Sequence, residues 1–382
     1  MGADSRPRAT SLGRTDRARR LVRRAPVALA RPPDPCTHSA RTVRRYVQGR
    51  ERRLARVIFF SGDDVRRAVS PERALDAIRD AFIAYARGEW TMPPKVYVPA
   101  NPAGDFRAMP ALGGGHALLK WVTSFPGNPA RGLPTVRGLV LLSDATNGTL
   151  EAAFDAAAVT ALRTGAAAVL AAETLGRDGR AAVVGAGVNG EAAVRTFVAR
   201  GREVLLYDID RERAANVAER TGAALASRDD ALAADAVVTV TPGREVVFAE
   251  GSLRAGQHVS LMGADGPGKQ EIAVEELVRV RVFCDDWEQG ETDGIRPHGR
   301  IYADDWEQAS HNGDLVHAVE AAVLTREDVA QLGDVLIGTA EGRKSDRDIT
   351  IFDSTGLAIQ DLAIALAAIE RADELDLSKI EL

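Results

Sequence analysis

A glycine-rich turn carries the clearest chemical signal in the sequence. It reads Gly185-Ala-Gly187-Val-Asn-Gly190, follows the strand-like run Ala181–Val184 and opens a helical run. Asp208 stands 23 residues after Gly185, at the end of the next strand-like run. This arrangement predicts a dinucleotide site, because the turn lets backbone approach a pyrophosphate and the helix N-terminus attracts its negative charge. A carboxylate at Asp208 would bind ribose hydroxyls and repel a 2′-phosphate, so NAD is favoured, while Arg211 nearby leaves NADP open.

Lysine is rare in this chain, and its placement is informative. Only five of the 49 basic residues are lysines. Lysine carries a compact ammonium whose pKa falls on burial, whereas arginine stays charged. Lys120 lies inside an apolar strand-like run, where an unpaired charge would be costly, so we favour a functional role over an outward-facing surface position. The pattern leaves Lys95 evenly balanced between a site and a surface role, and it favours a structural role for Lys269.

A carboxylate follows a later strand of the same region. Asp265 comes shortly after the run His258–Met262, which places it at the carboxyl end of a parallel strand, where such sheets bind ligands. It is therefore a candidate general base beside a nicotinamide. Spacing alone slightly favours the alternative, a turn aspartate in a glycine-rich loop.

Two patterns of elements must position these residues. Up to residue 176, a helix over Pro71–Arg87, short strand-like runs and an Ala-rich helical segment over residues 150–176 predict an α+β region. Beyond it, helical segments alternate with strand-like runs at Ala181–Val184, Val204–Tyr207, Ala236–Val240, His258–Met262 and Val280–Phe283. Such βαβ alternation predicts an α/β fold with a Rossmann, doubly wound parallel sheet.

The same patterns divide the chain into three expected parts. We expect residues 1–56 to be a basic extension without stable structure. Residues 57–176 and 345–382 are expected to form a substrate-binding and dimerisation domain completed by the C-terminal helix, and residues 177–344 the Rossmann domain. A targeting peptide, a basic arm for an anionic surface and translation from too early a start are alternatives for the extension.

Composition excludes several classes of protein. The 382 residues have a formal net charge of −5, but residues 1–56 hold 16 arginines against four acidic residues. The remainder holds 33 basic against 50 acidic residues, which argues against nucleic acid as a partner. No uncharged apolar run approaches the roughly 18 residues of a membrane helix. Two cysteines fit a reducing cytoplasm, and the six histidines show no metal-binding spacing.

One internal repeat is present. Residues 281–294 and 300–313 are identical at seven of 14 positions, at an offset of 19 residues. A single duplicated pair is not a solenoid, which needs three or more units. We interpret the pair as a local tandem insertion that forms a solvated loop, rather than as a site.

The ordered set of motifs resembles the ornithine cyclodeaminase/μ-crystallin family over about residues 57–382. The resemblance rests on Pro93-Pro-Lys95, Phe106-Arg107-Ala-Met-Pro110, Lys120-Trp-Val, Gly132-Leu-Pro-Thr135, Ala161-Leu-Arg163-Thr-Gly-Ala-Ala, the glycine-rich turn, Gly263-Ala-Asp265-Gly-Pro-Gly-Lys269 and Phe352-Asp-Ser354-Thr-Gly. It implies a homodimer, a substrate domain joined to a Rossmann domain, and chemistry at an amino-acid α-carbon.

The resemblance also implies roles for individual residues. Lys95, Lys120 and Arg163 match positions that hold the substrate carboxylate or line the site, and Asp265 matches the acid/base aspartate. Lys120 and Asp265 are thus the expected proton-transfer groups, with Lys95, Arg107 and Arg163 orienting the carboxylate. The expected cofactor-binding residues are Thr135, Gly185, Gly187, Val188, Asn189, Gly190, Asp208, Thr241 and Ser354.

One position helps to separate activities within the family. Where ornithine cyclodeaminases carry a glutamate two residues before Met-Pro, this sequence has Arg107, whose charge would repel a second amine on the substrate. Met92-Pro-Pro-Lys95 together with Asp105-Phe-Arg107-Ala-Met-Pro110 looks like the archaeal-type alanine dehydrogenase branch. The expected activity is NAD-dependent interconversion of alanine with pyruvate and ammonia. The alternatives are an ornithine cyclodeaminase, a cyclic ketimine or pyrroline-carboxylate reductase, and a μ-crystallin-like protein that binds a small ligand.

Overall fold

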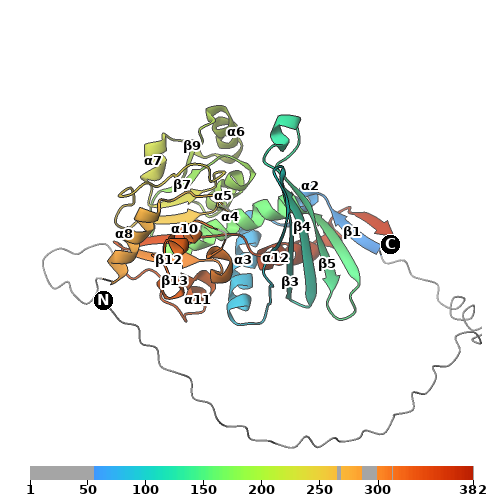
Figure 1. Ribbon diagram of the computed structural model, residues 1–382. Helices are drawn as coiled ribbons and strands as arrows, with labels where there is room; N and C mark the ends of the chain where they lie inside the picture. Colours follow the sequence, from blue (N-terminus) through green and yellow to red (C-terminus); the bar gives the residue numbers. More distant parts are fainter. Residues whose placement is uncertain (1–55, 265–267, 286–298, 312, 382) are drawn as a thin grey trace, which may run out of the picture. The chain divides into compact units, whose positions relative to one another are not determined.

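Two β-sheets and the helices between and around them make up the fold (Figure 1). The computed structural model describes residues 56–264, 268–285, 299–311 and 313–381, which belong to one compact unit, Leu54–Leu382. One sheet is largely antiparallel, and every strand pair of the other is parallel. The predicted α/β fold with a Rossmann-type parallel sheet is confirmed.

The first sheet has the strand order β15-β1-β6-β5-β4-β3-β2. Its strands are β1 (Arg56–Phe60), β2 (Val96–Ala100), β3 (Gly104–Gly113), β4 (His116–Ser124), β5 (Val136–Asp144), β6 (Leu150–Asp155) and β15 (Ser378–Glu381). Side chains alternate between its two faces: Leu118, Lys120 and Val122 of β4 are buried, whereas Leu119 and Trp121 are exposed. This alternation, fixed by hairpin pairing, turns Lys120 toward the interior.

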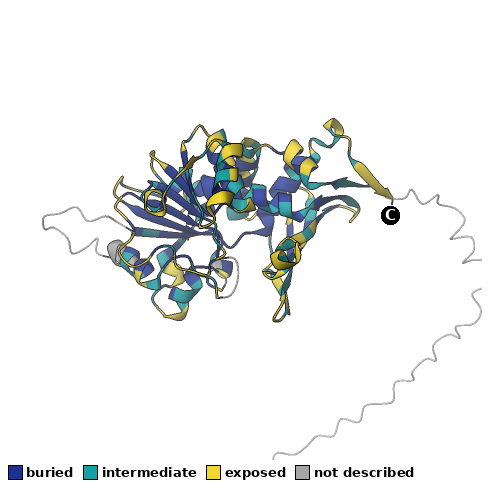
Figure 2. Cartoon of the chain, turned by 90° about the horizontal axis from the view of Figure 1, so that it is seen from above, coloured by how far each residue is buried: buried dark blue, intermediate teal, exposed yellow. Residues whose placement is uncertain are grey.

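The second sheet has the strand order β13-β12-β14-β11-β10-β7-β8-β9. Its strands are β7 (Ala181–Val184), β8 (Val204–Tyr207), β9 (Ala224–Leu225), β10 (Ala236–Thr239), β11 (His258–Leu261), β12 (Gly299–Ala303), β13 (Val329–Gln331) and β14 (Ile349–Asp353). Strands β7, β10, β11 and β14 are buried along their whole length, as Figure 2 shows. Helices on both faces explain why these strands are buried at every residue rather than at alternate residues, including the polar His258 and Ser260 of β11.

The interpretation of the tandem repeat as a solvated loop is wrong for its second copy. Val280–Phe283 is not a strand but part of α8 (Val274–Asp285), and the sheet strand is β12, from the second copy. β12 is almost wholly buried, so the described copy is a core strand and not a solvated loop. Because the two copies share half of their residues, a local pattern could not decide which of them joins the sheet. Residues 286–298, which include the rest of the first copy up to residue 294, lie outside the described part of the chain.

Helix boundaries follow from their caps. The predicted helix α3 (Pro71–Ala86) is confirmed, with the Ser70 hydroxyl accepting a hydrogen bond from Arg73 N at 3.3 Å. The expected helix over residues 150–176 is instead a strand, β6, followed by α4 (Ala156–Leu175). Asp155 caps α4 by accepting from Ala158 N at 2.7 Å. The remaining α-helices are α2 (Gly62–Ala68), α5 (Val188–Ala199), α6 (Arg211–Thr221), α7 (Arg228–Leu232), α9 (Trp306–Ala309), α10 (Leu315–Glu320), α11 (Leu332–Leu336) and α12 (Ala358–Ile369).

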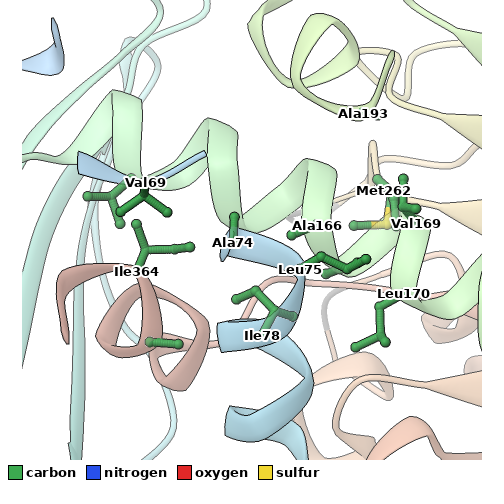
Figure 3. Close-up of a cluster of buried hydrophobic side chains, with 14 of the residues drawn as sticks. Val69, Ala74, Leu75, Ile78, Ala166, Val169, Leu170, Ala193, Met262 and Ile364 are labelled. Carbon is green, nitrogen blue, oxygen red and sulfur yellow. The ribbon is translucent and has the colours of Figure 1, made fainter. Parts of the chain in front are cut away.

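Helix α4 forms the centre of the packing. It contacts α3, α5 and α12 and strands of both sheets, among them β5 and β11. Figure 3 shows the resulting core, in which Leu75 and Ile78 of α3 lie near Val169 and Leu170 of α4. Among the described residues α4 is also the one helix long and apolar enough to cross a membrane. However, 72% of its most apolar window is buried inside the protein, as in a core helix.

The last segment of the chain contributes to both sheets. β14 lies inside the parallel sheet, whereas α12 packs against α3, β3 and β4. The sequence-based boundary at residue 345 would leave β14 outside the domain of the parallel sheet to which this strand belongs. Of the expected extension, residues 1–55 lie outside the described residues, and Arg56 begins β1.

Candidate active site

One cavity collects most of the predicted substrate-binding residues. It measures about 620 Å³ including its open mouth. Four cationic side chains line it: Lys95, Arg107, Lys120 and Arg163. No acidic side chain of the described residues lines it. The cavity is therefore suited to an anionic ligand group.

Lys120 is held deep in this cavity. Only 1% of the residue is exposed, and its Nζ donates to Thr160 Oγ1 at 2.7 Å and to Asp361 Oδ1 at 2.8 Å. The Thr160 hydroxyl in turn donates to Ala156 O, so it presents its oxygen to the amine. An ammonium carries three donors. Thr160 and Asp361 take two of them, which leaves the third for a molecule in the cavity.

Burial makes the Lys120 amine easier to deprotonate. Loss of solvation lowers its pKa from 10.5 to about 8. The Asp361 carboxylate opposes this by favouring the ammonium, whereas the charges of Arg163 and Arg107 add to the lowering. An amine with a pKa near neutrality can both accept and return a proton, which is what general acid–base catalysis requires.

Arg163 reaches the same cavity from α4. Its Nη1 donates to Gln360 Oε1 at 3.3 Å, and its Nε lies 3.8 Å from Asp361 Oδ1. Gly356 is packed so closely against the guanidinium that an added methyl group would overlap it. The turn after β14 therefore fixes where Arg163 can lie.

Arg107 is placed by its neighbours in the sheet. Its Nε donates to Asp105 Oδ1 at 2.6 Å, and its guanidinium lies over the Tyr97 ring at 5.3 Å from the centroid. Asp105, two residues earlier on β3, is thus an acidic partner of Arg107 among the described residues. The Arg107 guanidinium therefore lies at the cavity wall, and Asp105, which does not line the cavity, balances part of its charge.

Lys95 joins the site through the turn that follows β14. Its Nζ donates to Thr355 O at 2.6 Å. Asp304 holds that turn by accepting from Ser354 Oγ and Gly356 N, both at 2.9 Å. Burial raises the pKa of Asp304, while the nearby Lys95 ammonium counteracts that rise. The second copy of the tandem repeat therefore supplies a carboxyl group that shapes the cavity.

The glycine-rich turn has the geometry that a pyrophosphate needs. Gly185 follows β7 with φ +111°, a conformation that favours glycine, and a Cβ at Gly190 would overlap the Gly185 carbonyl oxygen. Gly187 is open, with nothing within 4 Å of an added Cβ, and it precedes α5 as its N-cap. The turn and α5 thus present backbone N–H groups and an unobstructed approach, so these residues fit a dinucleotide.

Asp208 lies directly after β8, close to this turn. Its carboxylate accepts from Ala186 N at 2.6 Å and from Arg213 Nη2 at 2.8 Å. Burial alone would raise the pKa of Asp208, but the Arg213 and backbone hydrogen bonds hold it below its usual range. Arg213 is the cation paired with Asp208, and it lines a second hollow together with Gly187 and Val188.

The other predicted cofactor residues fall in two places. Asn189 and Ser354 line the cationic cavity itself. Thr135 does not line it, although its neighbour Val136 does. Thr241 follows β10, and its Oγ1 donates to Glu271 Oε1 at 2.6 Å. The structure therefore brings Lys95, Arg107, Lys120, Arg163, Asn189 and Ser354 to one cavity.

Asp265 lies outside the described residues, so its expected role as an acid/base residue stays a prediction. The residues before it are held firmly. The buried Glu271 carboxylate accepts from Gly263 N at 2.8 Å and from Thr239 Oγ1 at 2.8 Å. Lys269, for which we expected a structural role, accepts a hydrogen bond from His317 Nε2 at its carbonyl oxygen, 2.9 Å away. Among the described residues, no group of three or more His, Cys, Asp or Glu is placed to hold a metal.

Sequence reasoning missed the two carboxylates that organise this site, Asp304 and Asp361. Asp361 had a readable signal, because it is the one charged residue of the apolar helix α12, just as Lys120 is in its strand. Asp304 had no such signal, because a repeat rich in acidic residues surrounds it. The criterion that singled out Lys120 would have found Asp361 as its partner.

Known amino-acid dehydrogenases and imine reductases resemble this chain in sequence and in structure. The chain is 40% identical over 328 residues to an alanine dehydrogenase of Archaeoglobus fulgidus, covering 82% of this chain and 95% of the relative. A solved archaeal alanine dehydrogenase dimer with bound NAD is 37% identical, with a TM-score of 0.76, and covers 86% of this chain and 99% of that one. The Thermococcus litoralis Delta(1)-pyrroline-2-carboxylate reductase, solved with NADH and L-proline, is 25% identical with a TM-score of 0.74. That match covers 85% of this chain and 100% of the reductase.

The family resemblance of the motifs is confirmed over nearly the whole described chain. The profile of one family matches residues 58–376, from β1 to beyond α12. The match includes all four cationic residues of the cavity and the glycine-rich turn. The chain belongs to the ornithine cyclodeaminase/mu-crystallin family.

Proposed function

We propose that this protein is an NAD-dependent oxidoreductase that interconverts a small L-amino acid, foremost alanine, with its 2-oxo acid and ammonia. The observation that carries the proposal is the convergence of Lys95, Arg107, Lys120 and Arg163 on one cavity. Asn189, from the glycine-rich turn, lines the same cavity, so a cofactor bound at that turn would reach the substrate. The 40% identity to an alanine dehydrogenase supports alanine in particular.

Each cavity residue has a task in this reaction. Bound NAD would supply the hydride acceptor. Lys95, Arg107 and Arg163 would hold the substrate carboxylate, since charge-assisted hydrogen bonds orient such groups. The α-carbon loses a hydride and the nitrogen a proton, which leaves an imine. Water then adds to the imine carbon, and the C–N bond breaks to release ammonia. Lys120, with the proposed partner Asp265, would accept and return the protons of these steps.

The cavity wall bears on substrate choice. An ornithine side chain carries a second ammonium, and no acidic side chain of the described residues lines the cavity to receive it. Apolar surface from Met109, Val122, Val136 and Met262 suits a small aliphatic side chain. The same surface would accept the ring of a cyclic imine. A pyrroline-carboxylate reductase is therefore the second candidate, supported by the relative solved with L-proline.

Absorbance of the reduced cofactor tests these candidates directly. We expect the purified protein to form NADH from alanine and NAD, and to consume NADH with pyruvate plus ammonium. Proline and ornithine are run in parallel. NADH formation from proline alone would select the imine reductase, and ammonia release from ornithine without net NADH would replace the proposal by a cyclodeaminase. Tight ligand binding without turnover of any of these compounds would indicate a binding protein.

We also propose that two copies of the chain form a cytoplasmic homodimer through the outer face of the first sheet. Exposed apolar side chains gather there around the half-buried Phe106. We call Val96, Phe106, Leu112, Leu119, Trp121 and Leu139 the outer apolar face. Val96, Ala108, Trp121 and Leu139 lie in one cross-strand row over four strands. Such a patch is unusual on a monomer and typical of an interface. The dimeric state of the solved archaeal relative supports a second copy as the occupant.

A further inference from the structure

Asp361 is a buried carboxylate at the back of the cavity that sequence motifs did not identify. It lies on α12 between Gln360 and Leu362, and its side chain is completely buried. Burying a carboxylate in an apolar helix is costly unless cations and hydrogen-bond donors compensate it. The compensation here comes from Lys120 Nζ at 2.8 Å and from the Arg163 guanidinium, whose Nε is 3.8 Å away.

Asp361 cannot act on the substrate directly. It does not line the cavity, and Lys120 and Arg163, which both do, stand between it and the open space. Any influence of Asp361 on the reaction must therefore pass through these two cations. The Arg163 Nε and the second carboxylate oxygen, Asp361 Oδ2, have no hydrogen-bond partner among the described residues. The guanidinium thus has an acceptor within reach that a small rotation would engage.

We propose that Asp361 is a positioning residue that favours the protonated form of Lys120 and sets the orientation of Arg163. The proposal rests on the proposed function for the identity of the reaction. It assigns a task to a side chain that touches neither substrate nor cofactor. Asp361 would influence Lys120 through its charge as well as through its position, because among the described residues it is the one anion in contact with the amine.

The charges around Lys120 show why the carboxylate matters. Besides Asp361 on α12, the described charged groups that act most strongly on the amine are Arg163 on α4 and Arg107 on β3, and both disfavour its protonation. Thr160 contributes an uncharged acceptor. Without the negative charge of Asp361, burial and two arginines would act together, and the amine would lose its proton at a lower pH.

The test is the protonation of Lys120 in Asp361→Asn, which removes the charge and nearly preserves the shape. The fraction of Lys120 modified by acetic anhydride over a pH series, read by mass spectrometry, reports the free amine without requiring turnover. The chain has only five lysines, so the Lys120 peptide is unambiguous. We expect the midpoint of modification to fall by one pH unit or more. The pH limb of kcat/KM that follows Lys120 should fall with it.

Two further variants keep the test decisive. Asp361→Glu retains the charge but moves it, so we expect an unshifted midpoint with a lowered kcat/KM. Asp373→Asn makes the same exchange at an exposed position after α12, and we expect no change. Equal midpoints in wild type and Asp361→Asn would overturn the proposal and leave Asp361 a purely structural residue. Should Asp361→Asn fail to fold, a shifted midpoint in Asp361→Glu would overturn it equally. Because the labelling needs no substrate, it stands apart from any failure of the proposed reaction.

Discussion

Lys120 shows how one side chain can be costly to the fold and useful to the site. Its ammonium is removed from water, and among the described residues the Asp361 carboxylate balances its charge. Burial outweighs this balance and lowers the pKa of Lys120 to about 8. An arginine at this position would remain charged at any physiological pH and would need more space and more hydrogen-bond acceptors. The rarity of lysine elsewhere in the chain is consistent with its retention here for proton transfer.

Replacing Lys120 with arginine should therefore stop the reaction without unfolding the protein. We expect turnover to fall by about 10²-fold or more, since a positioned acid–base group is worth that much. Measurements of kcat and of the thermal midpoint together separate lost chemistry from lost structure. Lys379→Arg, at an exposed position on β15, is the matched control. Near-normal turnover in Lys120→Arg would remove Lys120 from the mechanism.

The lowered pKa of Lys120 also predicts how stability depends on pH. Between about pH 8 and 10.5 the unfolded chain holds this proton while the folded protein has lost it, so the free energy of unfolding rises with pH in that window. Below pH 8 both states are protonated, and the penalty of burying the charge is fully present. Lys120→Met lacks the group and should lack this rise.

Urea unfolding at pH 7, 8, 9 and 10 would measure the effect. Above pH 8, the free energy of unfolding of the wild type should rise with pH relative to that of Lys120→Met. Lys379→Met, which removes an exposed lysine, controls for general effects of charge. A difference that stays constant over this range would show that Lys120 is not deprotonated in the folded protein.

At the scale of elements, the turn between β14 and α12 connects the two halves of the site. The backbone carbonyl of Thr355 accepts a hydrogen bond from the Lys95 ammonium. Ser354 and Gly356 donate hydrogen bonds to Asp304, and Gly356 packs against the Arg163 guanidinium. Gly356 adopts φ +76°, so a side chain there would be strained as well as crowded. The position of the turn thus determines where two of the four cations lie.

Gly356→Ala should accordingly weaken substrate binding more than cofactor binding. A methyl group would push the Arg163 guanidinium from its place, and we expect the KM for the amino acid to rise by about tenfold, corresponding to the loss of one charge-assisted hydrogen bond. The Kd for NADH, measured by fluorescence titration, should change little. Gly127→Ala adds the same methyl group in open space at an ordinary φ of −82° and serves as control. Equal effects on both ligands would place the turn in the cofactor site instead.

The glycine-rich turn allows a similar separation of causes. Gly187→Ala adds a methyl group where the protein leaves open space, so stability should persist while NADH binding weakens, because the group would meet the pyrophosphate. Gly190→Ala would overlap the Gly185 carbonyl, and it should lower the thermal midpoint as well. Calorimetric unfolding and NADH titration of both variants test this. Unaltered NADH affinity in Gly187→Ala would place the cofactor elsewhere.

The elements differ in how far their sequence alone predicts them. Helix α3 and the strand–turn–helix around Gly185 were predictable, since caps, periodicity and glycine spacing are local signals. The choice of β12 over Val280–Phe283 was not, because the partner strand β14 selects between two similar copies. Asp361 could have been found as the one charged residue of the apolar helix α12, but Asp304 became a site residue only through tertiary packing. The cavity could thus be predicted as a set of cations with one buried carboxylate, but without Asp304.

At the scale of the whole molecule, the first sheet links the site to the proposed interface. Lys120 and Trp121 are neighbours on β4 and point to opposite faces, one into the cavity and one onto the outer apolar face. A second copy packed against that face would restrict the movement of β4 from the side opposite Lys120. Association would therefore stabilise the position of Lys120, which lies on the other face of the same strand.

Trp121→Glu tests both parts of this argument. Trp121 is 42% exposed in the single chain, and a carboxylate in the middle of an apolar interface should shift light scattering from the mass of two chains to that of one. Val198→Glu, on an exposed position of α5, introduces the same charge away from the sheet and should leave the dimer intact. In the monomer we expect NADH affinity within about twofold of wild type, because the parallel sheet is untouched, and a kcat/KM lowered by about tenfold, equal to roughly 1.4 kcal/mol of lost positioning. If the Trp121→Glu protein stays dimeric, the interface lies on another surface. If it becomes a fully active monomer, dimerisation is not needed to position β4 for the reaction.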